Sequence, residues 1–481
     1  MIKRVLSDSV VYGLTRYASA IAAIFLTPIY TRMLLKEDYG AMDIFSSLNT
    51  LVIQVLPLGM TTAAMRFYPS FKEDPLLKRK SLGTILIALT ILGILYCLSM
   101  LILETFLVRQ VFKLEGYETV YRVCIFLVFG SLFMNYFQTI LIAKLDRKKY
   151  LIGSLTNFVL LSGLGFLFVY HFQTGIIGFF IASAIGMVVS LLLSLYFVWG
   201  DLGWEFDRQR LKQILGYSIH LVSAMVLFEL ANLLDRYILV TFGNLHDVGV
   251  YSIGARIANI TQLVVSGFSM AWFPLAMNIS KNENAKEIYS KVNALYVLLG
   301  AFFVCFLVLF RAELLAFFAP DYLESSSTIG ILTLFNYVAG SIYVFTLGIH
   351  VTGRTKSISK AAIASVGVNT LSSIVLYSLI GIEGVALGTL LGGLVWIGIQ
   401  YWESQKHYPI AFDKWSFFIA GIALLSAFSL SAVLVHLEWN PLQKLGIRVL
   451  LSMIVFCVVL FRLGASFRVL RKVLFSKVAK G

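Results

Sequence analysis

The amino-acid sequence is dominated by apolar stretches that recur along its whole length and are separated by short polar connections. A helix needs roughly 20 apolar residues to cross the hydrocarbon core of a bilayer, and lipid offers the backbone no hydrogen-bond partners outside the helix. We therefore expect a polytopic all-α membrane protein of about fourteen transmembrane helices. These are expected near residues 10–31, 40–64, 82–103, 120–143, 151–170, 175–199, 214–242, 248–278, 289–310, 327–350, 358–380, 382–402, 415–436 and 446–462, with a bend of the eighth at Pro274.

The composition excludes soluble classes of protein. Of the 481 residues, 59% are apolar and only 13% are charged, whereas soluble domains carry about 25% charged residues. The net charge of +14 could suggest a nucleic-acid partner. The basic residues, however, lie mainly between the apolar stretches, so we expect no nucleic-acid binding. The four cysteines all lie inside apolar stretches without a CxxC spacing, which argues against disulfides and zinc.

The distribution of Lys and Arg predicts the orientation. If alternate connections lie on opposite sides, one side carries 27 of the 39 basic residues and the other carries 6. Positive residues accumulate on the cytoplasmic side, so both termini are expected to be cytoplasmic. The N-terminal apolar run has no small-residue cleavage site and is interpreted as a retained helix. The predicted location is the plasma (inner) membrane.

The chain contains a weak internal repeat. Gly40 and Gly249 each lie at the start of a predicted helix and are 209 residues apart. The basic turn at Arg147 recurs at Arg354. Four small residues, Gly175, Gly178, Ala182 and Gly186, recur 206 residues later as Gly381, Gly384, Gly388 and Gly392. The alternative is that small residues at these spacings only let helices pack closely.

The repeat predicts two lobes of parallel orientation. Helices 1–6 pair with helices 7–12, and because six is even the copies are related by an axis along the membrane normal. The expected division is an N-terminal lobe at 1–213, a C-terminal lobe at 214–403, and an appended helix pair with a basic cytoplasmic tail at 404–481. Transporters of this design place substrate between the two halves.

Sequence motifs for catalysis are absent. There is no GxxxxGK[ST] loop for nucleotide phosphates, no HExxH and no suitable DxD pair. The carboxylates of the longest outer connections, near 104–119 and 311–326, form no convergent set and are interpreted as solvated loop charges. We therefore expect no enzyme activity, catalytic residue, metal site or cofactor.

Polar and charged residues inside the apolar stretches are the candidate site. Such residues are costly in a membrane and survive by facing a wet cavity, by pairing or by reaching the interface. The candidates for substrate binding are Arg16, Asp43, Gln54, Arg66, Asn232, Arg236, Arg256, Asn259, Gln262, Asn336 and His350, and those for ion coupling are Glu229 and Asp235. Several share a helical face, as Glu229, Asn232 and Arg236 do.

Two interpretations of these residues stay open. In the first they line a hydrated cavity, and the excess of arginines over carboxylates suits an anionic headgroup, because guanidinium groups bind phosphate bidentately. In the second they are structural pairs, with Asp235 or Glu229 neutralising Arg236, or Asp43 reaching Arg256.

Three segments carry a resemblance to a known family. Tyr30 to Leu34 with Tyr39-Gly40 and Arg66-Phe67, then Asp235 to Ile238 with Val248 to Ser252, and then Gly353 to Lys356 with Gly381 to Ala386 resemble polysaccharide flippases of the Wzx type. The resemblance extends over nearly the whole chain.

The resemblance implies the fold of the multidrug/oligosaccharidyl-lipid/polysaccharide exporter superfamily. It also implies export of an undecaprenyl-diphosphate-linked oligosaccharide to the outer leaflet for surface polysaccharide biosynthesis, by alternating access. The polymerase and glycosyltransferases of the same pathway are the implied partners. The alternative is an ion-coupled multidrug or metabolite antiporter of the same superfamily, which we would expect to bind cations through carboxylates.

Overall fold

The computed structural model describes residues 26–71, 74–280, 282–352 and 356–475, and almost all of them are helical. Within these ranges, eleven helices are long and apolar enough to cross a membrane, or twelve if the bent pair α2 and α3 is one span. The expected all-α membrane fold is confirmed. The predicted helix at 10–31 lies largely outside the described residues, and the predicted helix at 214–242 coincides with α8, Arg208–Phe242.

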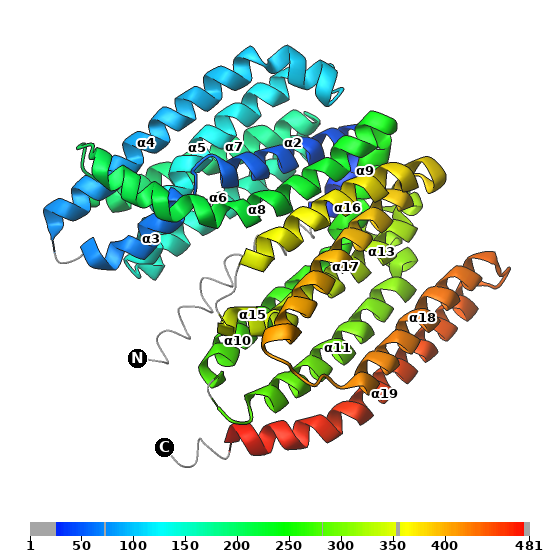
Figure 1. Ribbon diagram of the computed structural model, residues 1–481. Helices are drawn as coiled ribbons and strands as arrows, with labels where there is room; N and C mark the ends of the chain where they lie inside the picture. The colour runs from blue at the N-terminus through cyan, green and yellow to red at the C-terminus, as the bar shows by residue number, and fades with distance from the viewer. Residues whose placement is uncertain (1–25, 72–73, 281, 353–355, 476–481) are drawn as a thin grey trace. The chain divides into compact units, whose positions relative to one another are not determined.

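The internal contacts divide the chain into two compact units, residues 1–252 and 253–481. The first unit contains α2 to α8 and most of α9 (Figure 1). Its helices are α2 Lys36–Val55, α3 Met60–Phe71, α4 Pro75–Ile102, α5 Glu118–Ala143, α6 Arg147–Phe166, α7 Ile176–Val198, α8 Arg208–Phe242 and α9 Leu245–Ala258, with short η1 Phe106–Val111, η2 Leu167–His171 and η3 Trp199–Asp201.

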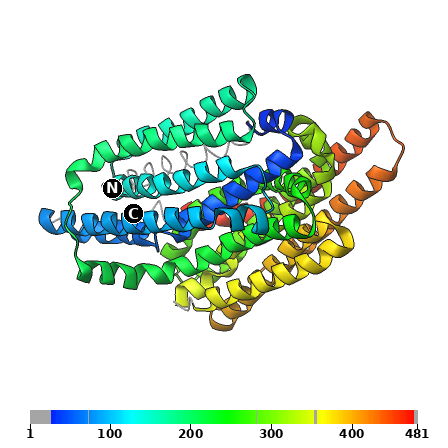
Figure 2. The ribbon, with the colours of Figure 1, turned by 90° about the horizontal axis from the view of Figure 1, so that it is seen from above.

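The second unit contains the remaining helices. They are α10 Ile260–Ile279, α11 Ala285–Leu309, α12 Arg311–Phe318, η4 Pro320–Ser325, α13 Ser326–Gly340, α14 Ile342–Phe345, α15 Leu347–Thr352, α16 Lys356–Ile380, α17 Ile382–His407, α18 Lys414–His436 and α19 Pro441–Phe475. Helices α18 and α19 form a hairpin that packs on α11 (Figures 1 and 2). The predicted appended pair is therefore part of the second unit.

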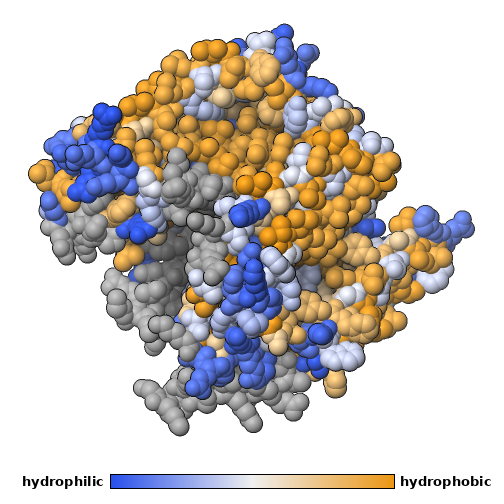
Figure 3. Space-filling model, viewed as in Figure 1, coloured by the Kyte–Doolittle hydropathy of each residue, from blue (hydrophilic) through white to orange (hydrophobic). Residues whose placement is uncertain are grey.

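The outward faces of the helices are hydrophobic. Large apolar side chains are exposed along most of them, including Ile102, Tyr196 and Phe461. Figure 3 shows broad hydrophobic areas, with hydrophilic residues gathered mainly toward helix ends and connections. Exposed apolar surface of this extent is what lipid tails cover.

At each end of the helices of the first unit, polar contacts join the connections to one another. Lys78 and Lys144 both form ion pairs with Asp201, which joins the start of α4 to the ends of α5 and η3. At the opposite helix ends, the Tyr117 hydroxyl donates to Asp38 at 2.7 Å, and Lys113 donates to the carbonyl of Thr241 at 3.0 Å. Each group joins connections or helix ends that the charge distribution assigns to the same side.

Several predicted spans are interrupted. Helices α2 and α3 meet at a bend of 46°, where Leu58 and Gly59 have positive φ values of 48° and 72°. The span predicted at 248–278 is interrupted at Asn259, between α9 and α10, whereas Pro274 lies inside α10. The bend at Pro274 stays a prediction. A proline interrupts only one backbone hydrogen bond, and membrane helices tolerate that loss.

The repeat-related glycines Gly40 and Gly249 pack against each other. A Cβ added to Gly40 would lie 2.9 Å from the nitrogen of Gly249 and 2.2 Å from the carbonyl oxygen of Leu245. A Cβ added to Gly249 would lie 2.1 Å from the carbonyl oxygen of Lys36. The starts of α2 and α9 therefore touch backbone to backbone, and only glycine leaves room for that approach.

A second pair of repeat-related glycines shares one conformation. Gly175 precedes α7 with φ 65° and ψ −153°, and Gly381 precedes α17 with φ 67° and ψ −137°. This region of backbone space is close to one that only glycine adopts without strain. The same turn therefore precedes α7 and α17, two helices that the predicted repeat pairs with each other.

Candidate functional site

The candidate site in the first unit is built around an ion pair between α8 and α2. The Nε atom of Arg236 donates to Oδ2 of Asp43 at 2.8 Å, and both side chains are at least 86% buried. The Nη1 atom of Arg236 also donates to the carbonyl oxygen of Asn232, one turn earlier in α8, at 3.1 Å. Two nitrogen atoms of the Arg236 guanidinium group, Nε and Nη1, therefore donate hydrogen bonds within the first unit.

An aromatic residue connects this pair to a second carboxylate. The ring centroid of Tyr251 lies 5.3 Å from the Arg236 guanidinium carbon, within range of a cation–π interaction. The Tyr251 hydroxyl donates to Asp235 at 3.0 Å, and Asp235 is only 2% exposed. Arg236 thus lies among Asp43, Tyr251 and Asp235, and its ion-pair partner is Asp43 rather than the neighbouring Asp235.

The other candidate carboxylate has a neutral partner. Nε2 of Gln54 on α2 donates to Oε1 of Glu229 on α8 at 2.8 Å, and both residues are partly buried. The helical face that Glu229 and Arg236 were predicted to share therefore contacts α2 at two points, through Glu229 and, two turns later, through Arg236.

The remaining arginines of the first unit are separate from this cluster. Arg66 on α3 is exposed, and its guanidinium carbon lies 3.9 Å from the ring centroid of Tyr217. The position of Arg66 over an aromatic face leaves its planar donors available at the edges. Arg16 lies outside the described residues.

Two of the candidate residues in the second unit contact each other. Asn336 donates through Nδ2 to Oδ1 of Asn259 and to the carbonyl oxygen of Ala258, both at 3.1 Å, across the interruption between α9 and α10. Gln262 is exposed on α10, Arg256 is half-buried on α9, and His350 on α15 packs edge-on against Phe273 with ring centroids 5.1 Å apart.

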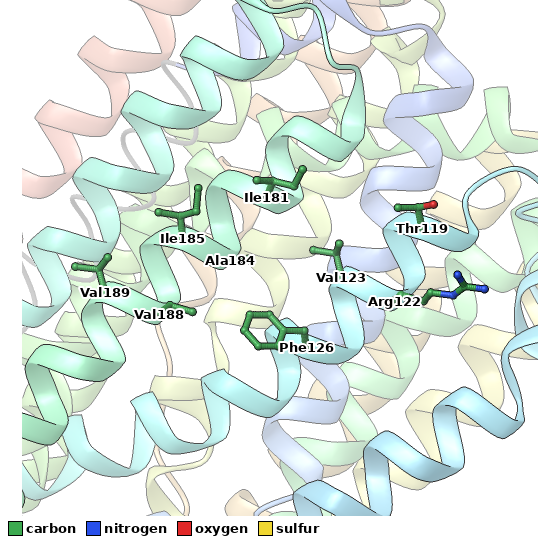
Figure 4. Close-up of a pocket in the computed structure, with 9 residues that line it drawn as sticks. All are labelled: Thr119, Arg122, Val123, Phe126, Ile181, Ala184, Ile185, Val188 and Val189. Carbon is green, nitrogen blue, oxygen red and sulfur yellow. The ribbon is translucent and has the colours of Figure 1, made fainter.

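A cavity on the side of the first unit has a different chemistry. It has a volume of about 510 Å³, lies between α5 and α7, and is lined by apolar side chains such as Phe126, Ile185 and Val188. Figure 4 shows the Arg122 side chain directed away from these groups, and it pairs with Glu104 at 2.9 Å. Such a groove suits lipid acyl chains and not a charged headgroup.

Two aromatic residues of the site were not among the predicted site residues. Tyr251 holds Asp235 and faces Arg236, and Tyr217 faces Arg66. Tyr251 belongs to the Val-Gly-Val-Tyr segment that carried the family resemblance, so a signal for it was present. Tyr217 lies in an apolar run, where a tyrosine has no distinguishing pattern.

The chain matches one protein family and is similar to solved structures of transporters. A family model described as polysaccharide biosynthesis protein matches residues 5–280. A structure of the lipid II flippase MurJ in an inward closed conformation superposes with a TM-score of 0.74 at 14% identity, covering 94% of this chain and 98% of that one.

Multidrug transporters share the same fold. An inward-facing multidrug resistance MATE family transporter of the MOP superfamily superposes with a TM-score of 0.70 at 18% identity, over 82% of this chain and 93% of that one. A MATE structure in the straight conformation gives 0.60 at 18% identity, over 84% and 95%. A search of curated protein sequences finds no match.

Proposed function

Because the chain belongs to the family of polysaccharide biosynthesis proteins, we propose that it is a flippase for a lipid-linked glycan. It moves an undecaprenyl-diphosphate-linked oligosaccharide from the cytoplasmic to the outer leaflet of the inner membrane by alternating access. Glycosyltransferases of the same pathway supply this substrate, and a polysaccharide polymerase uses the product.

The observation that carries this proposal is the extent of the structural likeness. The lipid II flippase covers 94% of this chain with a TM-score of 0.74, whereas the multidrug transporters cover 82% to 88% with TM-scores of 0.55 to 0.70. Together with the family match at residues 5–280, this fuller likeness favours a carrier of a lipid-linked substrate.

The contacts of Arg236 support a separate role for it. Its guanidinium group binds Asp43 and Asn232, so we assign it a positioning role between α2 and α8. The other candidate arginines, Arg16, Arg66 and Arg256, are proposed to bind the diphosphate, because guanidinium groups hold phosphate oxygens in pairs. The amides and imidazole of Gln54, Asn232, Asn259, Gln262, Asn336 and His350 are proposed to contact polar groups of the substrate.

For coupling to an ion gradient we favour Glu229 over Asp235. Asp235 is buried and accepts a hydrogen bond from Tyr251, next to Arg236. Glu229 accepts a hydrogen bond from the neutral amide of Gln54. A carboxylate with an amide partner can gain a proton without breaking an ion pair, which is the property a coupling group needs.

The direct test is a flipping assay with purified protein in proteoliposomes. The probe is an undecaprenyl-diphosphate-linked sugar that carries a fluorophore, and the readout is its loss of fluorescence when a membrane-impermeant reductant is added outside. With the protein present, the accessible fraction should rise toward completion as lipids cross. An accessible fraction equal to that of protein-free vesicles would overturn the proposal.

The same vesicles test the second candidate, an ion-coupled drug antiporter, which the likeness to multidrug transporters favours. Ethidium accumulation driven by a proton or sodium gradient, without movement of the lipid-linked sugar, would support the antiporter.

A further inference from the structure

The first unit contains a polar cavity that is distinct from the charged cluster. It has a volume of about 350 Å³ and lies among α2, α3, α5 and α6. The bend between α2 and α3 forms one wall, through Pro57 and Gly59. Because Leu58 and Gly59 have positive φ, the chain turns away from the line of α2 at this wall.

The polar part of the lining of this cavity is made of neutral hydrogen-bonding groups, beside apolar side chains such as Ile53 and Ile142. Amides come from Gln54, Asn135 and Gln138, and hydroxyls come from Thr61, Thr62 and others; the lining includes no Asp, Glu, Lys or Arg. Amides and hydroxyls donate and accept without carrying charge. Phosphate would call for cationic partners and an organic cation for carboxylates, so this lining favours an uncharged ligand rich in hydroxyls.

The amide side chains have hydrogen-bonding capacity beyond their contacts in the unit. Nε2 of Gln138 donates to Ser190 at 3.2 Å, and Nε2 of Gln54 donates to Glu229 at 2.8 Å. Each amide has two N–H donors and a carbonyl that accepts twice. A ligand in the cavity can therefore be recognised by several donors and acceptors at fixed positions.

We propose that this cavity binds one sugar ring of the transported glycan, apart from the arginines assigned to the diphosphate. The inference rests on the proposed function and adds a sugar-recognition site to it. The volume is at the lower end of the range for small-molecule sites, about 300–1,000 Å³. It is therefore suited to one uncharged sugar residue and not to the whole oligosaccharide.

The first experiment measures protection of the cavity by free sugars. Full-length protein with its four native cysteines replaced carries a single Thr62→Cys substitution, and a small maleimide labels it in detergent. Millimolar glucose, galactose and N-acetylglucosamine are compared with equal concentrations of choline and inorganic phosphate. At least one sugar should slow labelling at residue 62 several-fold, while choline and phosphate should not.

The matched control is Leu145→Cys, because Leu145 is 68% exposed at the turn between α5 and α6, outside the lining of this cavity. Its labelling should be the same with and without sugar. Protection of residue 62 by phosphate or choline, or equal slowing at both positions, would overturn the assignment.

The second experiment removes hydrogen-bonding groups while keeping side-chain size. The double variant Asn135→Leu, Gln138→Met is assayed for flipping of the lipid-linked sugar in proteoliposomes. Loss of two hydrogen bonds to the substrate should slow flipping roughly tenfold. Thr90→Val is the control, since the Thr90 hydroxyl donates within its own helix to Leu86 at 2.9 Å, and it should flip at the wild-type rate.

These outcomes separate the two proposals. If the wild-type protein flips no lipid-linked sugar, the proposed function fails. If the wild type flips and the double variant, inserted at equal abundance, flips at the same rate, only the cavity assignment fails. Thr62→Val removes a single hydroxyl from the lining of the cavity. Its flipping rate should fall between the rates of the wild type and the double variant.

Discussion

At the scale of single residues, Asp43 and Arg236 form a buried ion pair. The pair lies between helices that are far apart in sequence, and Asp235 adds a second carboxylate that accepts from Tyr251. Removing one member of a buried pair leaves the other charge without compensation, which costs more than removing both.

Asp43→Asn and Arg236→Gln should therefore each lower the stability of the protein by about 3 kcal/mol or more. The double variant should recover most of that loss. The measurement is the thermal unfolding midpoint and the abundance of the inserted protein. Glu287→Gln is the control, because Glu287 pairs with Lys291 on an exposed face and should cost less than about 1 kcal/mol.

If Arg236 instead binds diphosphate directly, the single and double variants should be equally inactive in flipping. Recovery of flipping in the double variant, together with recovery of stability, supports a positioning role. Continued inactivity at full abundance would contradict it.

Glu229 gives a prediction about coupling. Glu229→Gln preserves a hydrogen bond to Gln54 while removing the charge, so abundance and unfolding midpoint should stay close to those of the wild type. The variant should lose the dependence of flipping on an imposed proton or sodium gradient, measured in proteoliposomes with ionophore controls. A wild-type response to both gradients would exclude Glu229 as the coupling group.

At the scale of helices, close packing at glycine and capping at helix ends position the elements. The contact between Gly40 and Gly249 brings two backbones together with no room for a methyl group. The hydrophobic effect does not drive helices together inside lipid, so such close packing contributes much of their association.

Gly40→Ala and Gly249→Ala should each destabilise the protein by about 1–3 kcal/mol, because the added methyl group meets backbone atoms that cannot move alone. Gly163→Ala is the matched control on α6, where an added Cβ meets no atom within 4 Å. That variant should be neutral or stabilising by roughly 0.5–1 kcal/mol. Thermal unfolding in detergent compares the three, and equal midpoints would contradict the packing argument.

Asp413 caps α18 and connects it to α19. Its carboxylate accepts from the backbone N–H of Trp415 at 3.2 Å, from the Ser416 hydroxyl at 2.7 Å and from Arg462 at 3.0 Å. Burial by itself raises the pKa of Asp413. The hydrogen bond from Ser416 and the pairing with Arg462 outweigh it, so the pKa lies below its ordinary value.

Asp413→Ala should cost about 1–2 kcal/mol at neutral pH through loss of the cap, and Asp413→Asn should cost less because Asn also caps. Since the folded pKa is depressed, this stabilisation is fully present above the unfolded value of about 3.9 and is lost as pH falls through the folded value. Unfolding midpoints of wild type and variant should therefore converge in strong acid. A constant difference down to that range would exclude a charged role.

The sequence was sufficient to predict the membrane-spanning helices but not the breaks within them. Apolar length predicts a span near 40–64 whether or not the helix breaks, because hydropathy does not report backbone conformation. The Pro57-Leu58-Gly59 triplet was the local signal for the break between α2 and α3, whereas Pro274 lies inside α10.

Partners inside the site were harder to predict than the site residues themselves. Spacing along one helix shows which side chains share a face, as with Glu229 and Arg236. The choice of Asp43 for Arg236 depends on the axial offset between α2 and α8, across 193 residues of sequence. No pattern in a single sequence reports that offset.

At the scale of the whole molecule, the positive-inside bias predicts that both termini are cytoplasmic. In the first unit, the connections assigned to one side meet through Lys78, Lys144 and Asp201, and those assigned to the other meet through Tyr117 and Asp38. The alternation of sides therefore agrees with the contacts.

Reporter fusions test this topology. A fluorescent protein fused after residue 481 should be bright, since it folds in the cytoplasm, and alkaline phosphatase at the same point should be inactive. Phosphatase placed in the connection between α18 and α19, at residues 437–440, should be active. The opposite pattern at both positions would mean that the whole orientation is inverted.

The contact between Gly40 and Gly249 also bears on how the chain arose. The two glycines occupy equivalent positions of the predicted repeat, in which each copy would contribute the same residue to one contact. If the repeat began as the duplication of a single-copy gene, the ancestral contact required two chains, each offering this glycine to the other. Such self-complementary contact is the property of a two-fold symmetric homodimer. Gene fusion would then have freed each copy to diverge in charge while the shared glycine stayed fixed by geometry.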